Sequence, residues 1–152
     1  MKEIYYTYNN EAIACCIFLE FLQKVGTIDI ARSCLILPFL LDDRTVTYFQ
    51  QLSDEEKISL ESLTREQPRL FTSFNKRYMS LLPVSINALI LLNKNNQIGI
   101  TASEIYAKGI FLYGDVDMGD RFNKIKKNLP TFIRMIDEYS TVQLYRTLKI
   151  QL

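Results

Sequence analysis

Residues 77–101, with the sequence RYMSLLPVSINALILLNKNNQIGIT, predict a buried helix that runs into a short strand. Pro83 suits the first turn of a helix, because its fixed φ is already helical and its missing N–H would be unpaired there. The run that follows it, residues 84–92, is almost entirely apolar. Residues 94–97 are polar and indicate a turn, and residues 97–101 alternate between apolar and small or polar residues as a strand does.

A second strand is predicted between Ile105 and Tyr113, so the helix would lead into a small β-hairpin. A helix followed by such a ribbon is the skeleton of a winged-helix domain, a class that binds DNA or other proteins. The predicted fold is therefore mainly α with a small β-hairpin, a winged-helix-like α+β single domain over residues 1–152. The 152-residue length fits one domain with a substantial core.

The flanking segments predict further helices with recognisable ends. Residues 12–24 are apolar on nearly all sides, which indicates a central helix, with Asn10 as its N-cap and Gly26 as its C-cap. Other predicted starts share a capping residue or an N-terminal proline: Thr27 or Asp29, Ser53 with Glu56 as a capping box, Pro68, Pro130 and Ser140. The helix from Pro68 would place Leu70, Phe71, Phe74 and Tyr78 toward the core.

The charge and apolar pattern argue against nucleic acid and membranes as direct partners. Lys and Arg total 18 against 17 acidic residues, a net charge of +1, whereas DNA-binding proteins usually carry a basic surplus. The longest apolar run, residues 34–41, is far too short to span a bilayer. The polar, tyrosine-rich residues 1–10 do not resemble a signal peptide, so a cytoplasmic protein is expected.

The sequence offers little for catalysis. It has no histidine, which removes Ser-His and Cys-His nucleophiles and histidine metal sites. Cys15, Cys16 and Cys34 lie in apolar stretches without metal-ligand spacing, so they read as small buried hydrophobic residues. No Gly-rich phosphate loop is present, since the five glycines are scattered. We expect no enzyme activity, no cofactor and no metal.

Carboxylate pairs are the remaining chemical alternative. Asp42 and Asp43 precede a predicted helix, where acids usually serve as caps and as partners of the helix dipole. Asp115, Asp117 and Asp120 resemble a calcium loop only loosely, because the glycines are misplaced and the Glu that closes an EF-hand loop is missing. An enzyme that uses Asp115 and Asp117 ranks last among the functional hypotheses.

Exposed aromatic and basic residues give weak indications of binding. Tyr5, Tyr6 and Tyr8 crowd the polar N-terminus, and tyrosine is enriched at protein interfaces. Packing of this arm against its own domain explains them equally well. Lys124, Lys126 and Lys127 would face solvent on a helix, as charge runs usually do.

Several blocks, taken in order, resemble a known family. They are residues 10–12 (NEA), residues 35–39 (LILPF), Arg77-Tyr78 followed by residues 81–83 (LLP), and residues 140–150 (STVQLYRTLKI). Their order and spacing are similar to those of the middle component of bacterial ABC-three-component systems, over most of the chain. In that family a glycine usually follows the leucine of the last block, whereas Lys149 stands here.

The resemblance implies a non-enzymatic adaptor that links an SMC-like or Rad50-like ABC ATPase to an effector protein in bacterial defence against phage or plasmids. DNA would be contacted only indirectly through the complex, and a homo-oligomer is left open. The expected partner-binding patch comprises Tyr5, Tyr6, Asn10, Glu11, Arg77 and Tyr78. The alternative function is a winged-helix DNA-binding transcriptional regulator, which would need the Pro83 helix to present a polar face to the major groove.

Overall fold

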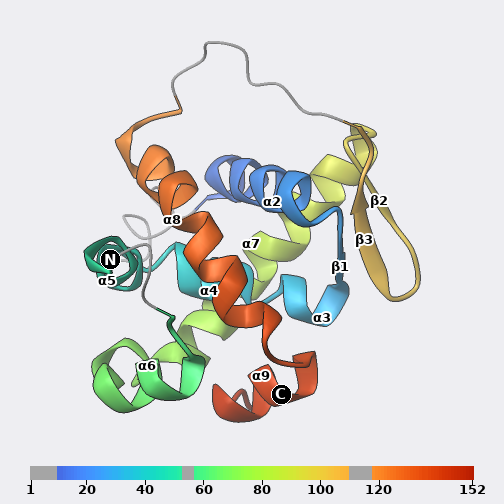
Figure 1. Ribbon diagram of the computed structural model, residues 1–152. Helices are drawn as coiled ribbons and strands as arrows, with labels where there is room; N and C mark the ends of the chain where they lie inside the picture. Colours follow the sequence, from blue (N-terminus) through green and yellow to red (C-terminus); the bar gives the residue numbers. More distant parts are fainter. Residues whose placement is uncertain (1–9, 53–56, 110–117) are drawn as a thin grey trace.

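The computed structural model describes residues 10–52, 57–109 and 118–152, which form a mainly helical fold with a small three-stranded antiparallel sheet (Figure 1). The helices are α2 (Glu11–Val25), α3 (Ile30–Ser33), α4 (Ile36–Leu40), α5 (Asp43–Gln51), α6 (Leu60–Glu66), α7 (Phe74–Lys94), α8 (Asp120–Asp137) and α9 (Thr141–Thr147), with a 3-10 turn at η1 (Pro68–Leu70). The strands are β1 (Thr27–Asp29), β2 (Ile98–Ile100) and β3 (Glu104–Ala107).

Helix α2 has the ends that the sequence predicts. The Asn10 side chain accepts hydrogen bonds from the backbone N–H groups of Ala12 and Ile13, which satisfies donors that have no partner within the helix. Gly26 ends the helix with φ +80°, a conformation that glycine adopts without strain. Most of α2 is buried, as its apolar pattern indicates, so the helix is central.

Helix α7 corrects the predicted role of Pro83. The structure has one helix from Phe74 to Lys94 with Pro83 in its interior, not a new helix that begins at Pro83. Leu81 and Val84 on either side of the proline are buried, and this packing holds the helix together although the proline removes one backbone hydrogen bond. Pro130 was expected to open a turn, and it likewise lies inside α8.

The predicted hairpin is present, and a third strand joins it. Strands β2 and β3 pair antiparallel, and β3 also pairs with β1, giving the order β1-β3-β2. The sequence pattern missed β1, because a strand of three residues is too short to show alternation. Gly99 lies opposite Tyr106, and a Cβ on Gly99 would stand 2.1 Å from that ring, so a larger residue there would displace the Tyr106 side chain.

Two other predicted boundaries differ from the structure. The capping box at Ser53 and Glu56 lies outside the described residues, and α6 begins only at Leu60, with Ser59 and Ser62 forming the capping box. The helix expected from Pro68 is split into the turn η1 and the start of α7. The Ser140 cap is confirmed, since its side chain accepts from the Gln143 N–H.

Just after the end of helix α9, Lys149 stands in the position where the family pattern has a glycine. Lys149 adopts φ +56°, and the N–H groups of Lys149 and Ile150 bond the carbonyls of Arg146 and Tyr145. This is the pattern of a Schellman motif. A lysine therefore occupies the left-handed position that glycine would take with less strain.

The core is built around aromatic rings contributed by α4, α7 and α8. Phe39 lies at its centre, with ring centroids 4.8 Å from Phe74 and 5.2 Å from Phe132. Phe132 also contacts Phe21 of α2 at 6.2 Å. Figure 1 shows the β2–β3 hairpin projecting from one side of these helices, while α6 and α9 lie away from it.

Candidate functional site

Helix α7 has a buried face and an exposed face, and both carry apolar residues. Leu81, Ala88 and Leu92 are buried against the core. Met79, Ile86, Ile90 and Leu91 are exposed, with between 44% and 50% of each residue open to solvent. Met79, Ile86 and Ile90, together with the exposed Pro83, follow the spacing i, i+4, i+7, i+11 and form one stripe, called here the α7 stripe.

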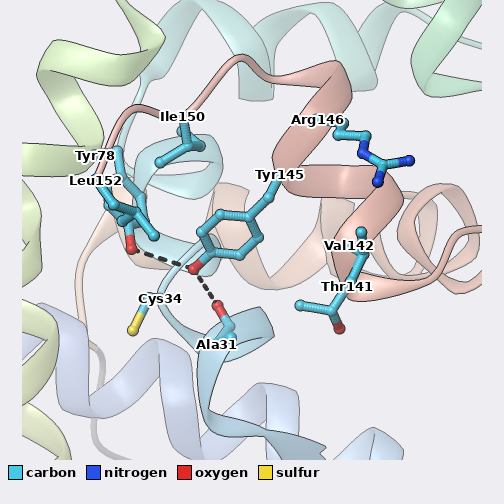
Figure 2. Close-up of a pocket in the computed structure, with 9 residues that line it drawn as sticks. All are labelled: Ala31, Cys34, Tyr78, Thr141, Val142, Tyr145, Arg146, Ile150 and Leu152. Atoms are coloured by element: carbon cyan, nitrogen blue, oxygen red, sulfur yellow. Dashed lines mark hydrogen bonds between the residues drawn. The ribbon is translucent and has the colours of Figure 1, made fainter.

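A groove lies between α9, α3 and α7, called here the α9 groove (Figure 2). Its volume is 510 Å³. Its lining is mostly apolar and comes from segments far apart in the chain: Ala31, Cys34, Tyr78, Thr141, Val142, Tyr145, Arg146, Ile150 and Leu152.

Two tyrosine rings meet in this groove. The rings of Tyr78 and Tyr145 pack edge to face, with centroids 5.8 Å apart and an interplanar angle of 82°. The Tyr145 hydroxyl donates to the carbonyl of Ala31 at 2.6 Å, and it lies 3.2 Å from the Tyr78 hydroxyl. Since the Tyr145 proton is committed to Ala31, the Tyr78 hydroxyl donates to Tyr145. Burial raises the pKa of Tyr145 far above its ordinary value.

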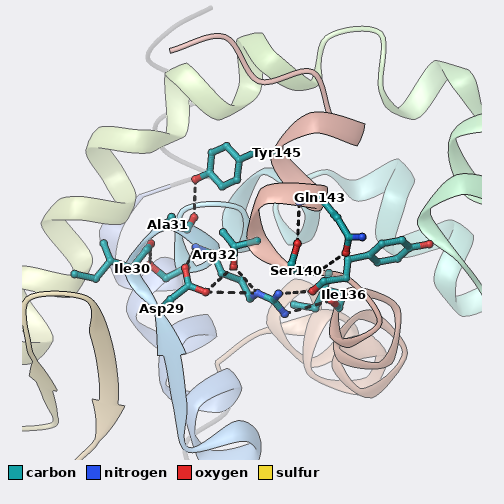
Figure 3. Close-up of polar contacts among 11 residues, drawn as sticks. Asp29, Ile30, Ala31, Arg32, Ile136, Ser140, Gln143 and Tyr145 are labelled. Atoms are coloured by element: carbon teal, nitrogen blue, oxygen red, sulfur yellow. Dashed lines mark hydrogen bonds and ion pairs between the residues drawn. The ribbon is translucent and has the colours of Figure 1, made fainter.

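A polar network anchors α9 beside α3 and so positions one wall of the groove (Figure 3). The Arg32 guanidinium donates to Thr141 Oγ1 at 3.1 Å, to the Ile136 carbonyl at 3.3 Å and to the Tyr139 carbonyl. The Thr141 hydroxyl donates in turn to Asp29 Oδ2 at 2.6 Å. Asp29 also caps α3 by accepting from the Arg32 N–H, which confirms one of the two predicted caps. Arg32 of α3 thereby supplies hydrogen-bond donors to carbonyl groups at the C-terminal end of α8.

The described residues contain neither a cluster of metal ligands nor a thiol with a lowered pKa. No group of three or more Cys, Asp or Glu side chains in residues 10–52, 57–109 and 118–152 could hold a metal ion. Burial raises the pKa of Cys15 to about 11 and also raises the pKa values of Cys16 and Cys34. These thiols stay protonated near neutral pH, and a protonated thiol is a poor nucleophile.

The predicted partner-binding residues do not form one surface among the residues that the structure describes. Asn10 is occupied as the α2 cap, and Glu11 Oε1 accepts a hydrogen bond of 3.2 Å from Asn87 on the exposed side of α7. Tyr5 and Tyr6 lie outside the described residues, as do Asp115 and Asp117 of the acidic loop.

The expectation of an exposed patch at Arg77 and Tyr78 is wrong. The Arg77 side chain is only 13% exposed, and its guanidinium donates to the carbonyls of Pro38 and Leu70. It also lies 5.1 Å from the Phe74 ring centroid, in a cation–π contact. Tyr78 is 3% exposed and contributes only to the floor of the α9 groove. Both residues join segments of the fold together.

Sequence reasoning missed both surfaces described above. It assigned Ile86, Ile90 and Leu91 to the core because residues 84–92 are almost continuously apolar. The sequence did carry a signal for the α7 stripe, because apolar residues at helical spacing occupy two faces of this helix. One face fills the core, and a second apolar face indicates a surface for a partner. For the groove, the helical spacing of Val142 and Tyr145 was visible, but the pairing of Tyr145 with Tyr78 was not.

The comparisons with known proteins add no relative. No known protein family, no curated protein and no solved structure matches this chain. In the part of the chain that the structure describes, every helix is too short or too polar to cross a membrane.

Proposed function

We propose that the chain is a non-enzymatic adaptor that binds other proteins through the α7 stripe. The observation that carries the proposal is the exposure of Met79, Ile86 and Ile90 on one face of a helix whose opposite face already fills the core. Contiguous exposed apolar side chains at helical spacing are typical of protein interfaces. The polar residues Ser80 and Asn87 border the stripe, as expected for the rim of an interface.

The partners that we propose follow from the family resemblance. They are an SMC-like or Rad50-like ABC ATPase and an effector protein of a bacterial defence system against phage or plasmids. ATP hydrolysis and the effector reaction would then belong to the other chains. The absence of histidine from the sequence agrees with such a division of labour.

We also propose a winged-helix architecture for the chain. The order helix α2, strand β1, helices up to α7, then β2 and β3, with β1 paired to β3, supports this assignment. In a DNA-binding winged helix, the helix before the hairpin enters the major groove and needs polar and basic residues. Here that helix is α7, and its outer face carries the α7 stripe.

DNA-binding regulation is the second candidate function, and the sheet order is the observation in its favour. Two of the three lysines of α8 already have partners within the protein. Lys124 donates to Thr47 at 2.7 Å, and Lys126 pairs with Glu20 at 3.4 Å. We therefore rank protein binding above DNA binding.

Co-purification with the proteins encoded by the flanking genes tests the adaptor function. The wild-type chain should associate with the ABC ATPase or the effector. The double variant Ile86→Glu/Ile90→Glu should weaken this association by at least ~10-fold, since a buried interface excludes charged side chains. Both positions are exposed, so the variant should retain the wild-type circular dichroism spectrum and melting temperature.

Ser80→Glu is the control, because it adds a negative charge to an exposed position of α7 beside the stripe. It should leave association within about twofold of wild type. Failure of the wild-type chain to associate with either protein would overturn the adaptor proposal. A gel shift that weakens as salt is raised would favour the DNA-binding candidate instead.

A further inference from the structure

The α9 groove has the dimensions and lining of a small-molecule site. Its 510 Å³ volume lies within the range of roughly 300–1,000 Å³ that is usual for such sites. Val142, Ile150 and Leu152 contribute apolar surface around the edge-to-face tyrosine pair. The groove is separate from the α7 stripe, so a ligand here would be a function beyond the proposed adaptor role.

The hydroxyl groups of the groove are already committed to the protein. Tyr145 donates to Ala31, Tyr78 donates to Tyr145, and Thr141 donates to Asp29 while it accepts from Arg32. No hydroxyl proton of these three residues is left for a ligand. A ligand body that fits these walls is therefore apolar.

Arg146 provides the charge at one end of the groove. It is the only lining residue with a formally charged side chain, and within residues 10–52, 57–109 and 118–152 that side chain has no hydrogen bond or ion pair. Figure 2 shows Arg146 and Val142 on one side of the Tyr145 ring, with Tyr78, Ile150 and Leu152 on the other. A guanidinium binds a carboxylate through two parallel hydrogen bonds.

We propose that the α9 groove binds an amphipathic monocarboxylate. Its apolar body lies across the Tyr145 ring toward Ile150 and Leu152, and its carboxylate pairs with Arg146. Charge complementarity selects this ligand class, because among the described residues the groove presents one cationic side chain at its end and no acidic side chain in its lining.

Isothermal titration calorimetry of the full chain with decanoate, below its micellar concentration, tests the proposal. Decanoate should bind saturably with one site per chain, and decanol should bind more weakly because it cannot pair with Arg146. Arg146→Gln should weaken decanoate binding by about 5- to 20-fold while it leaves decanol binding unchanged. Val142→Trp, at an exposed edge of the groove, should reduce the binding of both ligands by filling the space.

Lys149→Gln is the matched control, since Lys149 is an exposed cation near the end of α9 that does not line the groove. Its decanoate affinity should equal that of wild type. If Arg146→Gln and Lys149→Gln weaken decanoate binding equally, the effect comes from the overall positive charge and not from a specific pair with Arg146, which would overturn the proposal. Absence of saturable decanoate binding would also overturn the proposal. So would a Val142→Trp variant that loses association with a protein partner but binds decanoate with wild-type affinity. None of these variants changes the α7 stripe, so failure here is distinguishable from failure of the adaptor proposal.

Discussion

The Ser85 hydroxyl has no hydrogen-bond partner among the residues that the structure describes, although Ser85 is completely buried in α7. A buried polar atom that lost its water and gained no partner costs about 1–3 kcal/mol. Ser33 is equally buried, but its hydroxyl donates to the Ile30 carbonyl at 2.6 Å. The two serines therefore share the same burial and differ in whether the hydroxyl is satisfied.

Ser85→Ala should raise the free energy of unfolding by about 1 kcal/mol, because it removes an unpaired hydroxyl and leaves almost no cavity. Ser33→Ala is the control and should lower it by about 1 kcal/mol, since a satisfied hydrogen bond is lost. Urea denaturation followed by circular dichroism measures both changes. Equal destabilisation by the two substitutions would contradict the assigned difference between the hydroxyl groups.

At the scale of whole elements, Pro83 interrupts the backbone hydrogen bonds of α7 on its exposed side. A proline in a helix interior lacks the N–H that would bond the carbonyl four residues earlier. Pro83→Ala should raise the free energy of unfolding by about 1–2 kcal/mol, after allowance for the more flexible unfolded chain. Urea denaturation measures the stability, and amide hydrogen exchange should show slower exchange around residue 83.

Pro38→Ala is the comparison for this prediction. Pro38 is buried at the third position of α4, where a helical N–H has no acceptor within the helix. The substitution there should lower stability, because it removes buried apolar surface and restores no helical hydrogen bond. A loss of stability in Pro83→Ala similar to that in Pro38→Ala would show that the ring of Pro83 contributes packing instead.

Helix ends could be predicted from the sequence where a local side chain decides them. Asn10, Gly26, Asp29 and Ser140 act at the ends where the sequence places them. Pro83 could not be interpreted correctly, because local chemistry favours a helix start while the buried Leu81 and Val84 keep one helix continuous. Strand β1 could not be predicted, because its three residues form a strand only by pairing with the distant strand β3.

At the scale of the whole molecule, the two candidate surfaces depend on contacts between distant segments. Tyr78 and Tyr145 meet across the α9 groove, and Arg32 joins α3 to the carbonyl end of α8. A single sequence carries no signal for such pairings. The mainly helical fold with a hairpin was predictable, whereas the groove was not, and the exposed half of α7 was mistaken for core.

Alkaline pH should weaken the folded molecule through its buried thiols and Tyr145. Burial raises the pKa of Cys15 from 9.0 to about 11 and also raises the pKa values of Cys16, Cys34 and Tyr145. Above pH 9 the unfolded chain releases protons that the folded chain retains. Because the unfolded state then binds fewer protons, stability decreases as pH rises.

The free energy of unfolding should therefore be insensitive to these groups at pH 7–8 and should fall progressively from about pH 9 toward pH 11. Urea denaturation at intervals of half a pH unit measures the slope. Cys15→Ala should have a shallower slope above pH 9, because the substitution removes one group that titrates at a lower pH in the unfolded chain than in the folded chain. Its slope at pH 7–8 should match that of wild type. Stability that is flat from pH 8 to pH 10.5, or a slope unchanged in Cys15→Ala, would show that this thiol titrates alike in the folded and unfolded states and is not protected by burial.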